Sequence, residues 1–318
     1  MPHPDAPPTS PRRRLPLGLR GLMLLVAAVA GGLGYFLHTV RTQRDAVAAI
    51  ERTGGIVRYA WQDGLNGRSP ADPPGVPRRL VASLGPDYFG PITATFLGSR
   101  ADNATLAAVG RLPRLRILTV VSQRVGDAGL AHLGGLRDLQ VLTLQTPAIT
   151  SAGLEELRGL AALRELDLSG TRVEDLAPLA GLGRLTSCRL DRSAITDAGL
   201  AAAARLASLE NLTLNNTAIG DAGTIPLAAH PRLSRLAVPG TAITDAGVAT
   251  LARSPALKRL DVDGTRVTDA ALDHLDNAHR LECLEVRADG VTPGRLARFR
   301  QAHPRVLVFP YPRARISF

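Results

Sequence analysis

The residue types best suited to metal binding and catalysis are scattered along this chain. Its histidines are His3, His38, His132, His230, His274, His279 and His303. None stands beside a cysteine at the spacing of a metal-ligand pair, and His274 and His279 lie five residues apart in a helix-and-turn context that suits joint ligation poorly. We therefore expect no metal site and no bound cofactor.

Motifs of nucleophilic catalysis and phosphate binding are also missing. The sequence contains no G-x-S-x-G, no P-loop and no G-x-G-x-x-G between a strand and a helix. Its recurrent acids follow a threonine, as in Thr244-Asp245, and this pattern is typical of helix caps rather than of acid/base pairs. Cys188 and Cys283 fall four repeat strands apart, roughly 19 Å, which is too far for a disulfide. We predict that the chain is not an enzyme.

Composition narrows the choice of partner. The 318 residues carry a net charge of +10 and are 45% hydrophobic but only 3% aromatic. A basic balance can indicate a nucleic-acid or membrane-surface partner. No nucleic-acid module is recognisable, and part of the positive charge flanks an apolar segment. We expect no nucleic-acid partner, and a core built from Leu, Ile, Val and Ala.

That apolar segment, residues 21–40, reads GLMLLVAAVAGGLGYFLHTV and contains no acid, Lys or Arg. Twenty helical residues reach about 30 Å, enough to cross the hydrocarbon core of a bilayer. We predict a transmembrane signal anchor. The arginines at 12–14 and 20 favour a cytoplasmic N-terminus, with the rest of the chain outside the cytoplasm. A signal peptide cleaved near residues 28–30 and a buried helix of a soluble protein are the alternatives.

Beyond residue 112 the chain repeats itself about every 24 residues. Counting from the first leucine as position zero, apolar residues recur at positions 0, 3, 6, 8, 13, 18 and 21. One copy comprises Leu136, Leu139, Leu142, Leu144, Ile149, Leu154 and Leu157. The L-x-L at positions 6 and 8 predicts a half-buried strand, and the later spacing of three predicts a helix. The unit at 160–182 is two residues shorter, and its Pro178 favours a tighter turn. Since one copy cannot bury its own apolar face, the copies must stack.

The pattern L-x-x-L-x-L-x-x-T-x-[IV]-x-D resembles the leucine-rich repeat family over roughly residues 88–309. The resemblance implies an α/β solenoid with parallel strands on its concave face and short helices on its convex face. The subtype TAITDAGL, with the leader RDAVAAIERTGGIVRY and the later SLGPDYFG, is similar to membrane-anchored leucine-rich repeat proteins of planctomycete bacteria. The repeats are also similar to those of eukaryotic F-box leucine-rich proteins, although no F-box is found.

These features predict a five-part organisation. The parts are a disordered basic N-terminus (1–20), the transmembrane helix (21–40), a membrane-proximal helix, strand and cap (41–87), the repeat array (88–309) and a basic C-terminal tail (310–318).

The charged and amide side chains on the strand face are the candidate binding residues. Positions 5, 7 and 9 of each copy point away from the core. They carry Glu165, Asp167, Arg189, Asp191, Asn211, Asn215, Arg235, Arg259, Asp261, Asp263, Glu285 and Arg287. The sequence predicts a membrane-anchored module that binds an unknown protein partner on this face, because solenoids commonly bind there. The alternatives are a self-associating structural protein of the cell envelope and an adaptor similar to F-box leucine-rich proteins.

Overall fold

The computed structural model of the chain describes residues 19–62, 73–287 and 289–309. The predicted basic tail at 310–318 lies outside these residues, as does the predicted N-terminal segment 1–20 apart from its last two positions. The chain forms two compact units, Met1–Thr42 and Gln43–Phe318, which we describe separately.

The first unit is dominated by helix α1, Leu19–Arg52, which continues into the second unit. The sequence predicted a transmembrane helix at 21–40 and a separate membrane-proximal helix within 41–87, and the structure joins the two in 34 continuous residues. Large apolar side chains are exposed along its first half, including Leu24, Val29 and Tyr35. Among the described residues, this is the one helix long and apolar enough to cross a membrane. It ends before Gly54, whose φ of 75° is the left-handed conformation that commonly closes a helix.

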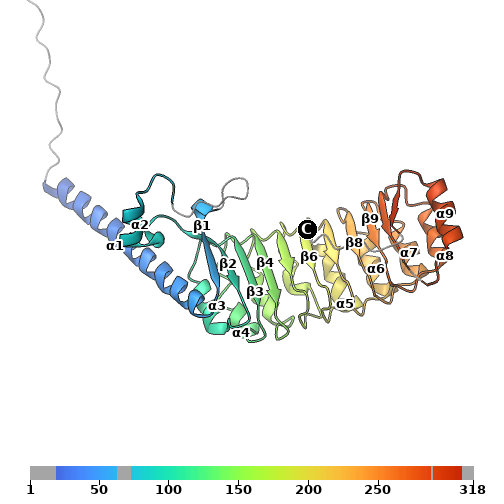
Figure 1. Cartoon of the computed structure of the whole chain (residues 1–318), viewed down its shortest axis with the longest axis horizontal. Coiled ribbons are helices and arrows are strands. Elements are labelled where there is room, and N and C mark those ends of the chain that lie inside the picture. Colours follow the sequence, from blue (N-terminus) through green and yellow to red (C-terminus); the bar gives the residue numbers. More distant parts are fainter. Residues whose placement is uncertain (1–18, 63–72, 288, 310–318) are drawn as a thin grey trace, which may run out of the picture. The chain divides into compact units, whose positions relative to one another are not determined.

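The second unit is organised around an eleven-stranded sheet, with the strands side by side in chain order (Figure 1). The strands are β1 (Ile56–Tyr59), β2 (Ile92–Leu97), β3 (Ile117–Val121), β4 (Val141–Gln145), β5 (Glu165–Asp167), β6 (Ser187–Arg189), β7 (Asn211–Thr213), β8 (Arg235–Ala237), β9 (Arg259–Asp261), β10 (Cys283–Glu285) and β11 (Leu307–Phe309). Strand β1 pairs with β2 in antiparallel orientation, and from β2 onward each strand pairs in parallel with the next. The predicted α/β solenoid of leucine-rich repeat type is confirmed.

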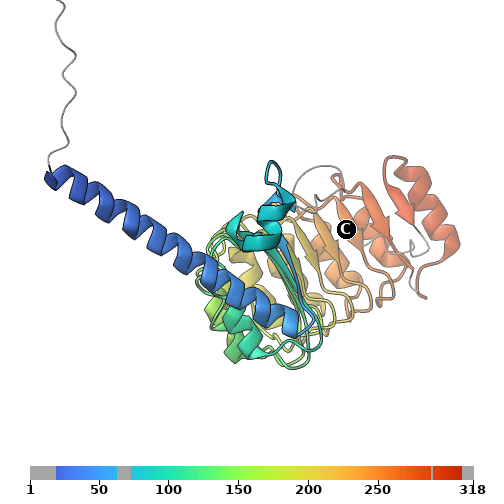
Figure 2. The same cartoon turned by 60° about the vertical axis from the view of Figure 1, so that its left-hand side comes forward.

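From α3 onward, short helical segments form the second layer of the repeats, behind the strands (Figure 2). Segments α2, η1 and η2 precede β2 and lie outside the repeats. The α-helices are α2 (Arg78–Leu84), α3 (Asn103–Val109), α4 (Asp127–Leu130), α5 (Asp197–Leu200), α6 (Asp221–Ala228), α7 (Asp245–Leu251), α8 (Asp269–Leu275) and α9 (Pro293–Ala302). The 3-10 helices are η1 (Ala60–Gln62), η2 (Pro86–Tyr88), η3 (Gly153–Leu157), η4 (Ala177–Leu179) and η5 (Ala201–Arg205). The tighter turn predicted around Pro178 is η4.

The core lies between these two layers. In β7, Leu212 is buried while Asn211 and Thr213 remain partly exposed on the opposite face. The same alternation in the other strands places positions 5 and 7 on one face, which we call the sheet face. His230 stands where earlier copies have a core leucine, and it too is buried. Its Nε2 lies 3.1 Å from the Leu206 carbonyl oxygen, and its Nδ1 accepts the Leu233 N–H at 3.0 Å. Hydrogen bonding on both ring nitrogens lets a polar ring replace a leucine.

A ladder of hydroxyls follows the strands and closes each turn. Each hydroxyl donates to the carbonyl three residues earlier, at 2.6 to 2.7 Å. The donors are Thr171, Ser193, Thr217, Thr241 and Thr265. These hydroxyls add a side-chain donor to the turn carbonyls, three of which (Leu168, Leu190 and Val262) also accept the backbone N–H three residues later.

The aspartate that begins each of the helices α6, α7 and α8 has a role that the sequence analysis missed. The hydroxyls of Thr244 and Thr268 accept hydrogen bonds at their helix starts, so the threonine is the cap. The carboxylate of Asp221 instead reaches the next repeat, where it accepts the Thr244 N–H at 2.8 Å and the Thr244 hydroxyl at 2.6 Å. Asp245 binds Thr268 in the same way. We call this contact the Asp–Thr clamp, and it fastens consecutive repeats to each other.

The last clamp predicts acid sensitivity. Hydrogen bonds from the Thr292 N–H and hydroxyl lower the pKa of Asp269 against an opposing effect of desolvation, with lesser contributions from Arg295 and Arg298. A carboxylate with a lowered folded-state pKa stabilises the fold above its unfolded pKa, and this contribution is lost as pH falls through the folded value. We expect a melting temperature that falls as pH drops below about 4. In Asp269→Asn the decrease in melting temperature at low pH should be smaller than in the wild type. An unchanged dependence of melting temperature on pH would show that the Asp269 carboxylate does not stabilise the fold.

A polar cluster ties α1 to the start of the array within the second unit. The Asp87 carboxylate is largely buried, and it accepts the Tyr59 hydroxyl at 3.0 Å and the Gln43 amide at 3.2 Å. The Tyr59 ring stacks on Trp61 with centroids 4.5 Å apart. Burial, followed by the neighbouring Asp87, raises the pKa of Tyr59. This cluster closes the first end of the sheet, where β1 covers β2.

Candidate functional site

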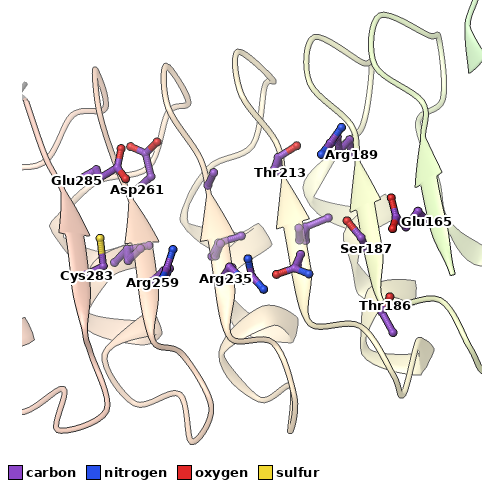
Figure 3. Close-up of a pocket in the computed structure, with 15 residues that line it drawn as sticks. Glu165, Thr186, Ser187, Arg189, Thr213, Arg235, Arg259, Asp261, Cys283 and Glu285 are labelled. Carbon is purple, nitrogen blue, oxygen red and sulfur yellow. The ribbon is translucent and has the colours of Figure 1, made fainter. Parts of the chain in front are cut away.

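A groove of about 400 Å³ crosses the sheet face from β5 to β10. Its floor and walls come from strand residues at positions 5, 6 and 7, with Thr186 before β6 (Figure 3). Six strands at about 4.8 Å spacing give the groove a length of roughly 24 Å. The volume lies in the range of small-ligand pockets, but the shape is long and open. We call it the sheet-face groove.

The structure brings most of the predicted site residues together here. Those that line the groove are Glu165, Arg189, Asn211, Arg235, Arg259, Asp261 and Glu285. Asp167 lies beside it, in a hollow of about 30 Å³ over β4 to β6. Strand pairing in register is the reason, because it places equivalent positions of successive repeats next to each other.

The four predicted residues at position 9 do not line the groove. Asp191 accepts the Asn215 N–H and its side-chain amide, both at 3.0 Å. Arg287 lies 3.5 Å from the Asp263 carboxylate. Position 9 follows the end of each strand, where neighbouring turns approach, so these side chains bind one another across repeats. Sequence periodicity places them on the sheet face but does not show this pairing.

Small side chains open the centre of the groove, and the sequence-based site omitted them. Ser187, Thr213 and Ala237 occupy positions 5 or 7 on β6, β7 and β8. The sequence does show short side chains among longer ones at these equivalent positions, but only charged and amide side chains were selected as candidates.

Positive and negative side chains are equal in number in the groove, and side chains of like charge lie next to each other. Its lining contains three arginines and three acids. Arg235 and Arg259 face each other on β8 and β9, and Asp261 and Glu285 face each other on β9 and β10. Figure 3 shows the two arginines at one level of the strands and the two acids nearer the carboxyl ends. We call these the arginine pair and the acid pair.

The cysteines belong to the core and the groove wall rather than to a reactive site. Neither forms a disulfide, as predicted from their separation. Burial, with a smaller effect of Asp167, raises the pKa of the Cys188 thiol to about 12, so it stays protonated and inert. Cys283 is 9% exposed at the end of the groove. Among the described residues, no three His, Cys, Asp or Glu side chains gather in a way that would hold a metal ion.

The sequence matches no protein-family model and no curated protein. Several solved structures have a similar fold. An internalin C2 from Listeria monocytogenes is 25% identical, with a TM-score of 0.48 over 58% of this chain and 84% of that one. An internalin from the same organism is 18% identical, with a TM-score of 0.46 over 65% and 70%. A plant peptide hormone receptor, RGFR1 in complex with RGF2, is 15% identical, with a TM-score of 0.44 over 67% and 34%.

Proposed function

We propose that this chain is a membrane-anchored binding module, without catalytic activity, that holds a protein partner in the sheet-face groove. The observation that carries the proposal is the groove itself, a depression about 24 Å long. Most of its lining side chains point away from the repeat core, and only Leu212, Leu236, Leu260 and Cys283 among them are buried. An extended segment of about seven residues would span that length at 3.3 Å per residue.

The charge of the groove favours a polypeptide over a polyanion. Three arginines and three acids leave the lining with no net charge. Nucleic acids are bound chiefly through basic surfaces that neutralise phosphates. A polypeptide presents charges of both signs together with neutral amides, and it suits a lining that mixes arginine, acid, Asn211 and Thr213.

The anchor is the second part of the proposal. The first half of α1 has the length of a bilayer span, and its large apolar side chains have no protein cover. The arginines before it favour a single-pass orientation with the N-terminus in the cytoplasm and the repeats outside. We also propose that the chain is related to the membrane-anchored leucine-rich repeat proteins of planctomycete bacteria, which the segment TAITDAGL resembles. Carbonate extraction and N-terminal sequencing of the mature chain distinguish this anchor from a cleaved signal peptide.

The substitution Ala237→Trp tests the groove. Ala237 lies on β8 in the middle of the groove floor, and an indole there would fill the space that a bound segment needs. We expect the full chain, crosslinked in its native membrane, to lose its captured partner. The measurement is quantitative mass spectrometry of the crosslinked material relative to the wild-type chain.

The matched control is Ala229→Trp, which adds the same indole to an exposed position just after α6. Capture by this variant should equal that of the wild type, and both variants should melt as the wild type does. Capture that survives Ala237→Trp would show that the groove is not the binding site. Recovery of the chain itself as the captured protein would support the self-associating alternative.

A further inference from the structure

The strand pairing creates two like-charge neighbours on the sheet face. Arg235 and Arg259 are direct partners in the β8–β9 register, and Asp261 and Glu285 are direct partners in the β9–β10 register. Like charges directly opposite each other on neighbouring strands are destabilising. Elsewhere in the paired register of β5 to β10, positions 5 and 7 place no two charges of the same sign side by side.

Neither arginine of the pair has its charge neutralised by a direct partner. Within the part of the chain that the structure describes, the guanidinium groups of Arg235 and Arg259 make no hydrogen bond or ion pair. Both side chains are exposed. Other surface charges are paired between repeats, as in Lys258 with Glu282 at 2.7 Å. The groove therefore keeps two neighbouring guanidinium groups open to a ligand.

The spacing fits one anionic group. Neighbouring strands lie about 4.8 Å apart, so two guanidinium groups on them can bind the two oxygens of one carboxylate from either side. The acid pair lies one strand further along and two residues further up. The centres of the two pairs are therefore roughly 8 Å apart.

From this juxtaposition we propose that the groove recognises an extended peptide segment carrying a carboxylate and a basic group on the same face, two residues apart. The carboxylate binds the arginine pair, and the basic group binds the acid pair. Side chains two apart on an extended chain point the same way and are separated by about 7 Å, which matches the diagonal between the pairs. This inference rests on the proposed function and names the chemistry of its ligand.

An anion alone would satisfy only half of this arrangement. A phosphate or a polyanion would be attracted to Arg235 and Arg259 but repelled by Asp261 and Glu285 one strand away. Opposite charges on one ligand neutralise both pairs, and they also fix the direction in which the segment lies.

The test is a binding selection on the full chain in detergent micelles. The probes are N-acetylated, C-amidated octapeptides with Glu at one position and Lys two residues later, beside matched peptides in which Glu, Lys or both are replaced by Gln. We expect the Glu-x-Lys peptides to bind at least tenfold more tightly than either singly substituted set. Heparin and phosphatidylglycerol vesicles serve as competitors, and they should not displace the peptides.

Substitutions in the chain test which charged pair binds the peptide Glu and which binds the peptide Lys. Arg235→Gln with Arg259→Gln should abolish the preference for Glu, and Glu285→Gln should weaken the preference for Lys. We leave Asp261 unchanged because its carboxylate accepts the Asp263 N–H at 3.0 Å. The control is Arg205→Gln with Arg253→Gln, at the ends of helical segments, which should bind as the wild type does.

The outcomes separate this inference from the proposed function. Octapeptides that bind without charge preference, yet are blocked by Ala237→Trp, would overturn the charge assignment and leave the groove as the binding site. Displacement by heparin or vesicles would identify an anion site and overturn the inference. Octapeptides that bind equally to wild type and Ala237→Trp would contradict both. As a ligand-free check, Arg235→Gln should raise the melting temperature at low salt, and a fall would contradict repulsion within the arginine pair.

Discussion

Replacing Gly199 with alanine should destabilise the second unit by about 3 kcal/mol or more, because there is no space for the added methyl group. A Cβ at this position would collide with the backbone carbonyl of Glu174 in the preceding repeat. Backbone cannot turn aside as a long side chain can. The free energy of unfolding, from denaturant titration followed by circular dichroism, measures the effect.

The direction of this effect is opposite to that of helix propensity. Gly199 lies in α5, and alanine in a helix is usually about 1 kcal/mol more favourable than glycine. The control is Gly181→Ala, where an added Cβ would have no atom within 4 Å. It should change stability by no more than about 0.5 kcal/mol. Equal stability of the two variants would contradict the close approach of the two repeats.

Loss of one Asp–Thr clamp is the next largest effect. Asp221→Ala removes the acceptor of two hydrogen bonds from Thr244. Bonds to a charged group are worth about 1.5 to 3 kcal/mol each when buried, and partial exposure here reduces the pair to about 2 kcal/mol in total. Gly247 leaves room for this carboxylate, since a Cβ there would collide with it. Thermal and denaturant unfolding measure the loss.

A surface acid gives the comparison. Asp138 pairs with Arg114 at 3.3 Å, with both side chains largely exposed, and such pairs contribute about 0 to 1 kcal/mol. Asp138→Ala should therefore cost far less than Asp221→Ala. A double-mutant cycle of Asp221→Ala with Thr244→Val isolates the clamp. Additive losses would mean that the carboxylate acts elsewhere.

The architecture was predictable because one pattern of apolar residues recurs along the chain. Apolar residues at positions 6 and 8 demand a strand with one buried face, and Leu212 and Leu236, both at position 6, are buried neighbours in paired strands. The antiparallel pairing of β1 was not predictable. This strand lies outside the repeats, so the repeat pattern does not give its partner or its direction.

For the candidate site, the sequence predicted the face of the sheet but not which residues on that face line the groove. Period two places Asp191 and Arg259 on the same side of the sheet, but Asp191 is bound to Asn215 whereas Arg259 lines the groove. The difference arises where neighbouring turns meet, and a one-dimensional pattern does not contain that contact. The carboxylates of Asp221 and Asp245 show the same limit: their spacing indicated caps, and their partners lie one repeat away.

The claim that the sheet-face groove holds the partner is tested most directly by one ratio. It is the amount of partner crosslinked to the Ala237→Trp chain in its native membrane, divided by the amount crosslinked to Ala229→Trp. An indole on β8 fills the groove, and the same indole after α6 leaves it open. The groove assignment predicts a ratio near zero with matching melting temperatures. A ratio near one would place the partner on another surface and contradict the account.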